Sequence, residues 1–263
     1  MNSETSQLLT NSGPKADSLG ESTTQYTALE VPADHSEDHL LNTEVLRDAI
    51  IGLADGLTVP FALAAGLSGL SDPKIVILAG FAELIAGSIS MGLGGYLAAR
   101  SEIEHYDAEK EREEIEIVEF PQAEEQEIVE IFEPYGITPE EIAPIIAKLK
   151  KNPVKFVDFM MKFELNLEKP DEYRSVISAA TIGISYFVGG IIPLVPYLFF
   201  DSTRKGLAVS SAVTLLTLFV FGIFRAHFIG LKSVYKSAFQ TMMIGSLAAF
   251  GSYLMVMLTG SEH

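Results

Sequence analysis

Two long apolar stretches in the first hundred residues are interrupted by side chains that could bind metals or protons. Asp48 and Asp55 lie seven residues apart within residues 47–69. Seven residues are about two helical turns, so we expect both carboxylates on one face of a helix. An acid inside a membrane-spanning helix is costly and normally faces a bundle interior or a water-filled path. Asp55 is therefore a candidate functional acid, whereas for Asp48 the alternative is a position at the lipid headgroups.

The second apolar stretch carries Glu83 near its middle and Met91 eight residues later, a little over two turns along the same face. Carboxylates and a thioether combine hard and soft donors, which suits a borderline divalent metal such as Fe²⁺. Carboxylates in a low-dielectric path can also accept protons. The alternatives are that Glu83 only hydrogen-bonds between helices and that Met91 only fills the core.

A third group of candidate ligands lies in an acidic stretch farther along the chain. Glu113 and Glu116, and then Glu124 and Glu127, form two i, i+3 pairs, and Met160 and Glu164 form an i, i+4 pair. Acidic runs are usually solvated helix faces, and that alternative stays open here. Clustered carboxylates nevertheless repel one another unless a cation lies between them. The pattern predicts a site for several divalent ions.

Composition limits the class of protein that can hold these residues. The 263-residue chain has a formal charge of −17 and contains no Cys. Its mean hydropathy is nevertheless positive, so charged and apolar residues must be segregated, as in a membrane protein with an acidic soluble part. Without Cys there is no disulfide, Cys-type zinc site or iron–sulfur cluster. The acidity argues against nucleic acid as a partner and favours cations.

Five apolar stretches are long enough to cross a bilayer, which requires about 20 residues. They cover residues 45–70, 75–99, 176–200, 206–228 and 239–259. We therefore predict an all-α membrane protein of five transmembrane helices, with helices 1 and 2 in residues 43–99 and helices 3 to 5 in residues 175–263. Residues 1–42 are polar and predicted to be disordered. Their segment ETSQLL, residues 4–9, matches an acidic dileucine sorting signal.

Residues 100–174 differ from the rest because they hold 21 acidic and 10 basic residues. Their apolar residues recur at helical spacing, and Thr138-Pro139 and Asn152-Pro153 are typical helix starts. We predict a small helical domain inserted between transmembrane helices 2 and 3. Basic residues after the fourth apolar stretch outnumber those after the third, which places this domain and the N-terminus in the cytoplasm and the C-terminus on the opposite side.

Three segments of the chain resemble the vacuolar iron transporter family of plants, fungi and some protists. They are RDAIIGLADGLTVPFALAAGLSG, AELIAGSISMGLGGYLAARSE and FMMKFELNLEKP, and the resemblance covers about residues 47–260. It implies a homodimer in the vacuolar membrane, a metal path near the dimer axis and a cytoplasmic metal-binding domain. It also implies exchange of Fe²⁺ for protons, without a prosthetic group.

Carried over residue by residue, the resemblance assigns roles to nine residues. Asp55, Glu83 and Met91 match the transmembrane path positions. The cytoplasmic metal site is matched by Glu113, Glu116, Glu124, Glu127, Met160 and Glu164, which could also bind Mn²⁺, Co²⁺ or Zn²⁺.

Two other functions remain open on the sequence alone. One is a Mn²⁺ or broad divalent-metal transporter of the same fold, since the proposed ligands tolerate several metals. The other is a membrane-bound di-iron ferroxidase, because Glu102-Ile103-Glu104-His105 has the Glu-x-x-His spacing of such enzymes. Those bundles use this motif twice, and residues 100–174 contain no second His.

Overall fold

The computed structural model describes residues 43–70 and 72–260, in which all regular elements are helical. Five of the helices are long and apolar enough to cross a membrane, which confirms the prediction. They are α1 (Thr43–Leu67), α2 (Pro73–Glu119), α6 (Arg174–Leu194, extended by the 3-10 turn η3, Val195–Leu198), α7 (Thr203–Phe228) and α8 (Val234–Gly260). The predicted disordered tail and its dileucine segment lie outside the described residues.

Helix α2 continues without a break from the second apolar stretch into the acidic segment. Its 47 residues span about 70 Å at about 1.5 Å per residue, more than twice the roughly 30 Å hydrocarbon core of a bilayer. Only its apolar first half therefore fits inside a membrane. The helix ends at Glu119 because Pro121 follows, and a proline disfavours helical backbone at the residue before it.

Three short helices follow α2, and each begins with a proline. They are α3 (Pro121–Phe132), α4 (Pro139–Leu149) and α5 (Pro153–Phe163). The starts predicted at Thr138 and Asn152 are present: Glu141 Oε2 accepts a hydrogen bond from the Thr138 N–H at 2.8 Å, and Asn152 Oδ1 accepts one from the Lys155 N–H at 3.3 Å. Helices α3 and α5 pack against α2, and this places the acidic residues of the three elements near one another.

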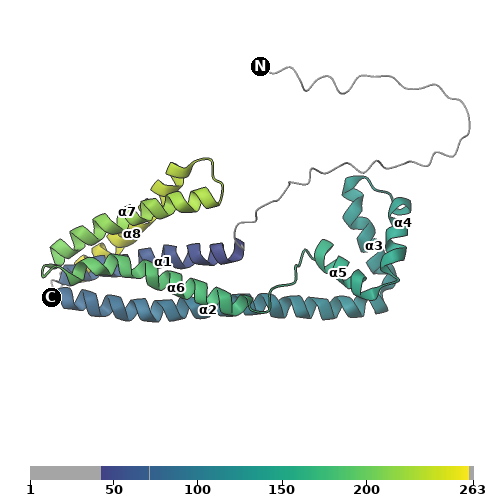
Figure 1. Cartoon of the computed structure of the whole chain (residues 1–263), viewed down its shortest axis with the longest axis horizontal. Coiled ribbons are helices and arrows are strands. Elements are labelled where there is room, and N and C mark those ends of the chain that lie inside the picture. Colours follow the sequence, from purple (N-terminus) through teal and green to yellow (C-terminus); the bar gives the residue numbers. More distant parts are fainter. Residues whose placement is uncertain (1–42, 71, 261–263) are drawn as a thin grey trace, which may run out of the picture. The chain divides into compact units, whose positions relative to one another are not determined.

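In the apolar part, α1 packs chiefly against α6, which also packs along α2, while α7 and α8 form a pair and α8 returns to α1 (Figure 1). Glycines allow α1 and α6 to touch through their backbones. A Cβ built at Gly56 would lie 2.2 Å from the Tyr186 carbonyl oxygen, far inside van der Waals contact. This close approach holds the middle of α1, including Asp55, beside the middle of α6.

Candidate metal sites

Five of the six residues predicted for the acidic domain meet in one cluster. Carboxylate oxygens of Glu113 and Glu116 on α2 and of Glu124 on α3 lie within 4.8 Å of one another. The same holds for Glu124, Glu127 and Glu164, the last of which directly follows α5. Glu124 belongs to both groups, so the five carboxylates are continuous. We call them the glutamate cluster.

Two members of the glutamate cluster are strongly shielded from solvent. Glu113 is 1% and Glu124 2% exposed. Within the described residues, Oε2 of Glu113, Glu124 and Glu164 accepts no hydrogen bond and is closed to solvent. A buried carboxylate without a partner is unfavourable unless it is neutralised by a proton or a cation.

The pKa values of two members reflect this burial. Burial, followed by the negative charges of Glu113 and Glu127, raises the pKa of Glu124 to about 7. Burial and the charges of Glu127 and Glu113 likewise raise the pKa of Glu164 to about 7. Near neutral pH the cluster thus exchanges protons readily, and a divalent ion would compete with them for the same oxygens.

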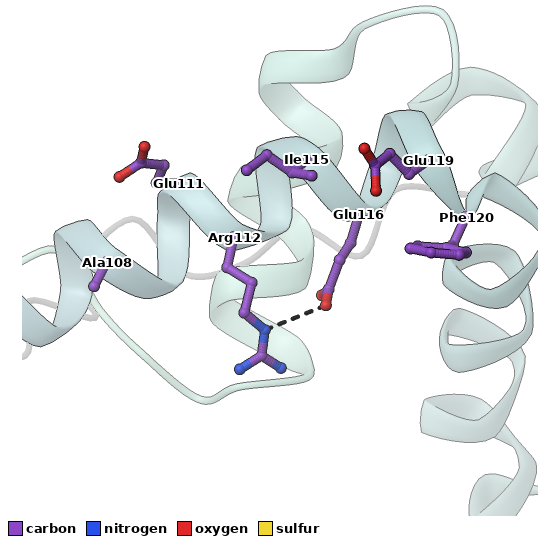
Figure 2. A pocket seen from close by; sticks show the side chains of 7 residues that line it. All are labelled: Ala108, Glu111, Arg112, Ile115, Glu116, Glu119 and Phe120. Carbon is purple, nitrogen blue, oxygen red and sulfur yellow. Dashed lines mark hydrogen bonds and ion pairs between the residues drawn. The ribbon is translucent and has the colours of Figure 1, made fainter.

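One edge of the cluster carries a basic residue. Figure 2 shows Arg112 donating from Nε to Glu116 Oε1, at 3.2 Å, beside a shallow cavity that runs along α2 to Phe120. The Arg112 side chain is 59% exposed and also lies 3.3 Å from Glu109. Arg112 therefore pairs with Glu116 from the solvent side. Its positive charge offsets the partly exposed Glu116, whereas Glu113 and Glu124 are the buried members of the cluster.

Met160, the sixth predicted ligand, is completely buried. It packs in the core of the acidic domain with Ile128, Ile142 and Phe156. The Glu164 N–H donates to the Met160 carbonyl oxygen at 2.9 Å, so these two residues lie one helical turn apart. Core packing is thus an observed role of Met160, and its role as a metal ligand stays a prediction.

Two of the three predicted path residues, Glu83 and Met91, lie near Tyr186 of α6, which sequence reasoning missed. The Tyr186 hydroxyl donates to Glu83 Oε1, and Glu83 Oε2 is buried without a partner among the described residues. Met91 packs against the buried group that contains Tyr186. Asp55 is exposed and directly precedes Gly56, where α1 touches the Tyr186 backbone. A hydroxyl inside an apolar stretch needs a hydrogen-bond partner, and that signal could have drawn attention to Tyr186.

Asp48 is buried in an ion pair and does not lie exposed at a membrane surface. Its Oδ2 accepts a hydrogen bond from Nη1 of Arg174 at 2.7 Å, and both side chains are 3% exposed. Arg174 also lies 2.5 Å from Glu44, through Nε. Asp48 therefore joins the start of α1 to the first residue of α6. Sequence reasoning did not single out Arg174, although an Arg at the start of an apolar stretch calls for an acidic partner.

The helices that carry these sites lie within a single match to a known family. The sequence profile of the VIT family matches residues 46–257. The chain belongs to the VIT family.

Similar VIT-family proteins share about half of their residues with this chain. Vacuolar iron transporter 1 of Arabidopsis thaliana is 51% identical over 220 residues, which cover 83% of this chain and 88% of the relative. Vacuolar iron transporter 1 of Tulipa gesneriana is 52% identical over 223 residues, 84% of this chain and 90% of the relative. Protein CCC1 of Saccharomyces cerevisiae is 42% identical over 229 residues, 84% of this chain and 70% of the relative.

Proposed function

We propose that this VIT-family protein carries Fe²⁺ from the cytoplasm into the vacuole in exchange for protons. The main support is Glu83, whose Oε2 is buried and unpartnered among the described residues, within a helix apolar enough to cross a membrane. Such an oxygen is stabilised by a passing cation or by a proton, and both ions would use the same group. The choice of iron as the metal and of the vacuolar membrane as the location follows the names of the relatives, which are vacuolar iron transporters.

In this proposal Asp55 and Glu83 are ligands of the transported ion and acceptors of the returning proton. Two nearby carboxylates in a low-dielectric path do not both stay ionised without a cation between them. When Fe²⁺ leaves towards the acidic lumen, a proton takes its place, and the neutral cytoplasm receives that proton. Met91 supplies the soft donor that favours Fe²⁺ over harder cations.

The acidic domain would lie in the cytoplasm, with the N-terminus on the same side and the C-terminus in the lumen. There the glutamate cluster, with Met160, would bind several divalent ions before they reach the path. The five carboxylates offer enough negative charge for more than one divalent ion. Fe²⁺ is the expected cargo, and Mn²⁺, Co²⁺ and Zn²⁺ suit the same oxygen ligands.

A homodimer is proposed because Asp55 is exposed on a single subunit. A carboxylate that faced lipid would be strongly unfavourable. A second copy against this face of α1 would enclose Asp55 and complete a path between the two subunits.

The deciding experiment is Fe²⁺ uptake into liposomes under an imposed pH gradient, with the parent protein and with Glu83→Gln. The variant keeps the size of the side chain and its hydrogen bonding but removes its charge. We expect Glu83→Gln to abolish both Fe²⁺ uptake and the coupled proton flux. Uptake at the parent's rate and with the parent's pH dependence would contradict the proposal.

The same liposomes separate the two other functions. Comparable uptake of Mn²⁺ at equal concentration would favour a broad divalent-metal transporter. Oxygen consumption on adding Fe²⁺ to purified protein would favour a ferroxidase. Against that reading, His105 lies outside the glutamate cluster, with Nδ1 3.9 Å from Glu109.

A further inference from the structure

Tyr186 occupies the centre of the transmembrane site, yet it is neither acidic nor a usual ligand for a divalent metal. Its side chain is 3% exposed. The hydroxyl donates to Glu83 Oε1, which leaves Oε2 as the oxygen of Glu83 without a partner in the described part of the chain. Tyr186 therefore distinguishes two otherwise equivalent oxygens of one carboxylate.

The surroundings fix the Tyr186 ring and the hydroxyl in place. Gly87 lies one helical turn after Glu83, and a Cβ there would lie 2.6 Å from the Tyr186 hydroxyl oxygen. On the other side, Gly56 of α1 touches the Tyr186 backbone. Helix α2 thus leaves room for the Tyr186 side chain at Gly87, whereas α1 contacts the Tyr186 backbone, and a Cβ at position 87 would have to displace the ring.

We propose that Tyr186 is a positioning residue that orients Glu83 toward the transported divalent cation. This inference rests on the proposed function of Glu83 as a ligand. By occupying Oε1, the Tyr186 hydroxyl holds the carboxylate in one orientation and presents Oε2 to the ion. A carboxylate held in this way loses less conformational freedom when the ion binds than one that turns freely.

The hydroxyl is separable from the bulk of the side chain. In Tyr186→Phe the ring still packs beside Gly87 of α2, but Glu83 loses its donor. A hydrogen bond to a charged group is stronger than one between neutral groups, so we expect its loss to raise the KM for Fe²⁺ uptake about tenfold. The maximal rate should change much less, because the charge of Glu83 remains.

Tyr197 offers a matched control. It is also a buried tyrosine, 2% exposed, and its hydroxyl lies 2.8 Å from Ser68 Oγ, with Glu83 bonded instead to Tyr186. Tyr197→Phe removes the same atom from the same fold and should leave the KM for Fe²⁺ unchanged. Gly87→Ala provides a second route, since the added methyl displaces the Tyr186 hydroxyl without altering any ligand, and it should reproduce the raised KM.

A binding cycle tests whether Tyr186 acts through Glu83. Co²⁺ binding is measured on the full-length protein with Glu113, Glu116, Glu124 and Glu127 all changed to Gln, so that the path dominates the signal. Tyr186→Phe and Glu83→Gln should each weaken binding, and the double variant should bind no worse than Glu83→Gln alone. Losses that simply add would mean a general structural role and would overturn the inference.

Different results would contradict the proposed function and the role of Tyr186. If the parent protein moves no Fe²⁺, the proposed function fails, while the Co²⁺ cycle still measures the coupling. If the parent moves Fe²⁺ but Tyr186→Phe keeps the parent's KM, the inference about Tyr186 is wrong and the transporter stands. A KM raised equally by Tyr186→Phe and Tyr197→Phe would also overturn the inference.

Discussion

Glu124 links the two groups of three carboxylates that make up the glutamate cluster. It is the member common to both groups of three carboxylates, and its buried oxygen has no partner among the described residues. Its neighbour Glu125 points elsewhere and forms an ion pair with Lys150. Adjacent glutamates of one helix therefore differ in role. Glu124 faces α2, and Glu125 faces Lys150 at the end of α4.

Glu124→Gln should weaken metal binding at the whole cluster, whereas Glu116→Gln should affect only the group to which Glu116 belongs. We expect a loss of at least about tenfold in affinity for the former, since a charged ligand shared by two ions is lost. Titration of the full-length protein with Co²⁺ measures both affinity and stoichiometry. Glu125→Gln is the matched control and should bind like the parent; an equal loss there would contradict the assignment.

The raised pKa values predict how pH acts on the acidic domain without metal. The pKa of Glu124 and of Glu164 is about 7 in the folded protein, against 4.5 for an ordinary Glu. The folded state thus binds more protons than the unfolded state between these values. The stability that these two groups contribute is greatest at low pH and is lost as pH rises from 4.5 through about 7.

Hydrogen exchange of α3 and α5 in the full-length protein, corrected for intrinsic rates, should therefore show more protection at pH 5.5 than at pH 8. Adding Co²⁺ at pH 8 should restore the protection, because the cation replaces the lost protons. Protection that increased with pH in the presence of a chelator would show that the cluster is not the controlling feature.

Helix α6 follows the acidic segment and contacts both α1 and α2. Its first residue, Arg174, is held by Asp48 of α1, and its middle presents Tyr186 to Glu83 of α2. The backbone contact between Gly56 and Tyr186 holds α1 and α6 together between these two sites.

Breaking the buried pair on one side should destabilise the protein. Asp48→Asn removes the buried partner of Arg174 and leaves the half-exposed Glu44 as a charged partner, and removing one member of a buried pair costs about 3–5 kcal/mol. We expect a clear fall in the Tm of the detergent-solubilised protein. Arg47→Met is the control, because Arg47 is 59% exposed and lies 3.8 Å from Asp48; an equal fall in both variants would contradict the role given to Arg174.

For the whole molecule, the exposure of Asp55 bears on the number of subunits. Val59 lies one turn after Asp55, is 43% exposed and shares its face of α1. The chain has no native Cys. A single introduced cysteine can therefore form a disulfide only with the same cysteine of a second copy.

Val59→Cys should form disulfide-linked dimers in membranes under mild oxidation, because a second copy is proposed against this face. Leu247→Cys on α8 is the control, because Leu247 is also exposed, at 62%. This variant should run as a monomer on non-reducing SDS–PAGE. Crosslinking at position 247 and none at position 59 would place the subunit interface on a different helix.

The sequence alone determined the membrane class, the five apolar helices and most of the candidate ligands. Those conclusions depend on local properties: the length of apolar stretches, prolines at helix starts such as Pro139, and carboxylates at i, i+3 spacing. The family resemblance then assigned roles to the residues, and the family itself is confirmed.

Only the tertiary structure decided which residues meet. The turn at Phe120 and Pro121 brings the α2 and α3 pairs together around Glu124, a relation between helices that spacing within one helix does not contain. Arg174 lies 126 residues from Asp48, and Tyr186 lies 103 residues from Glu83. These partners depend on how α1, α2 and α6 pack. Gly52 and Gly56 have the four-residue spacing typical of close helix packing, but that spacing does not specify which helix they contact.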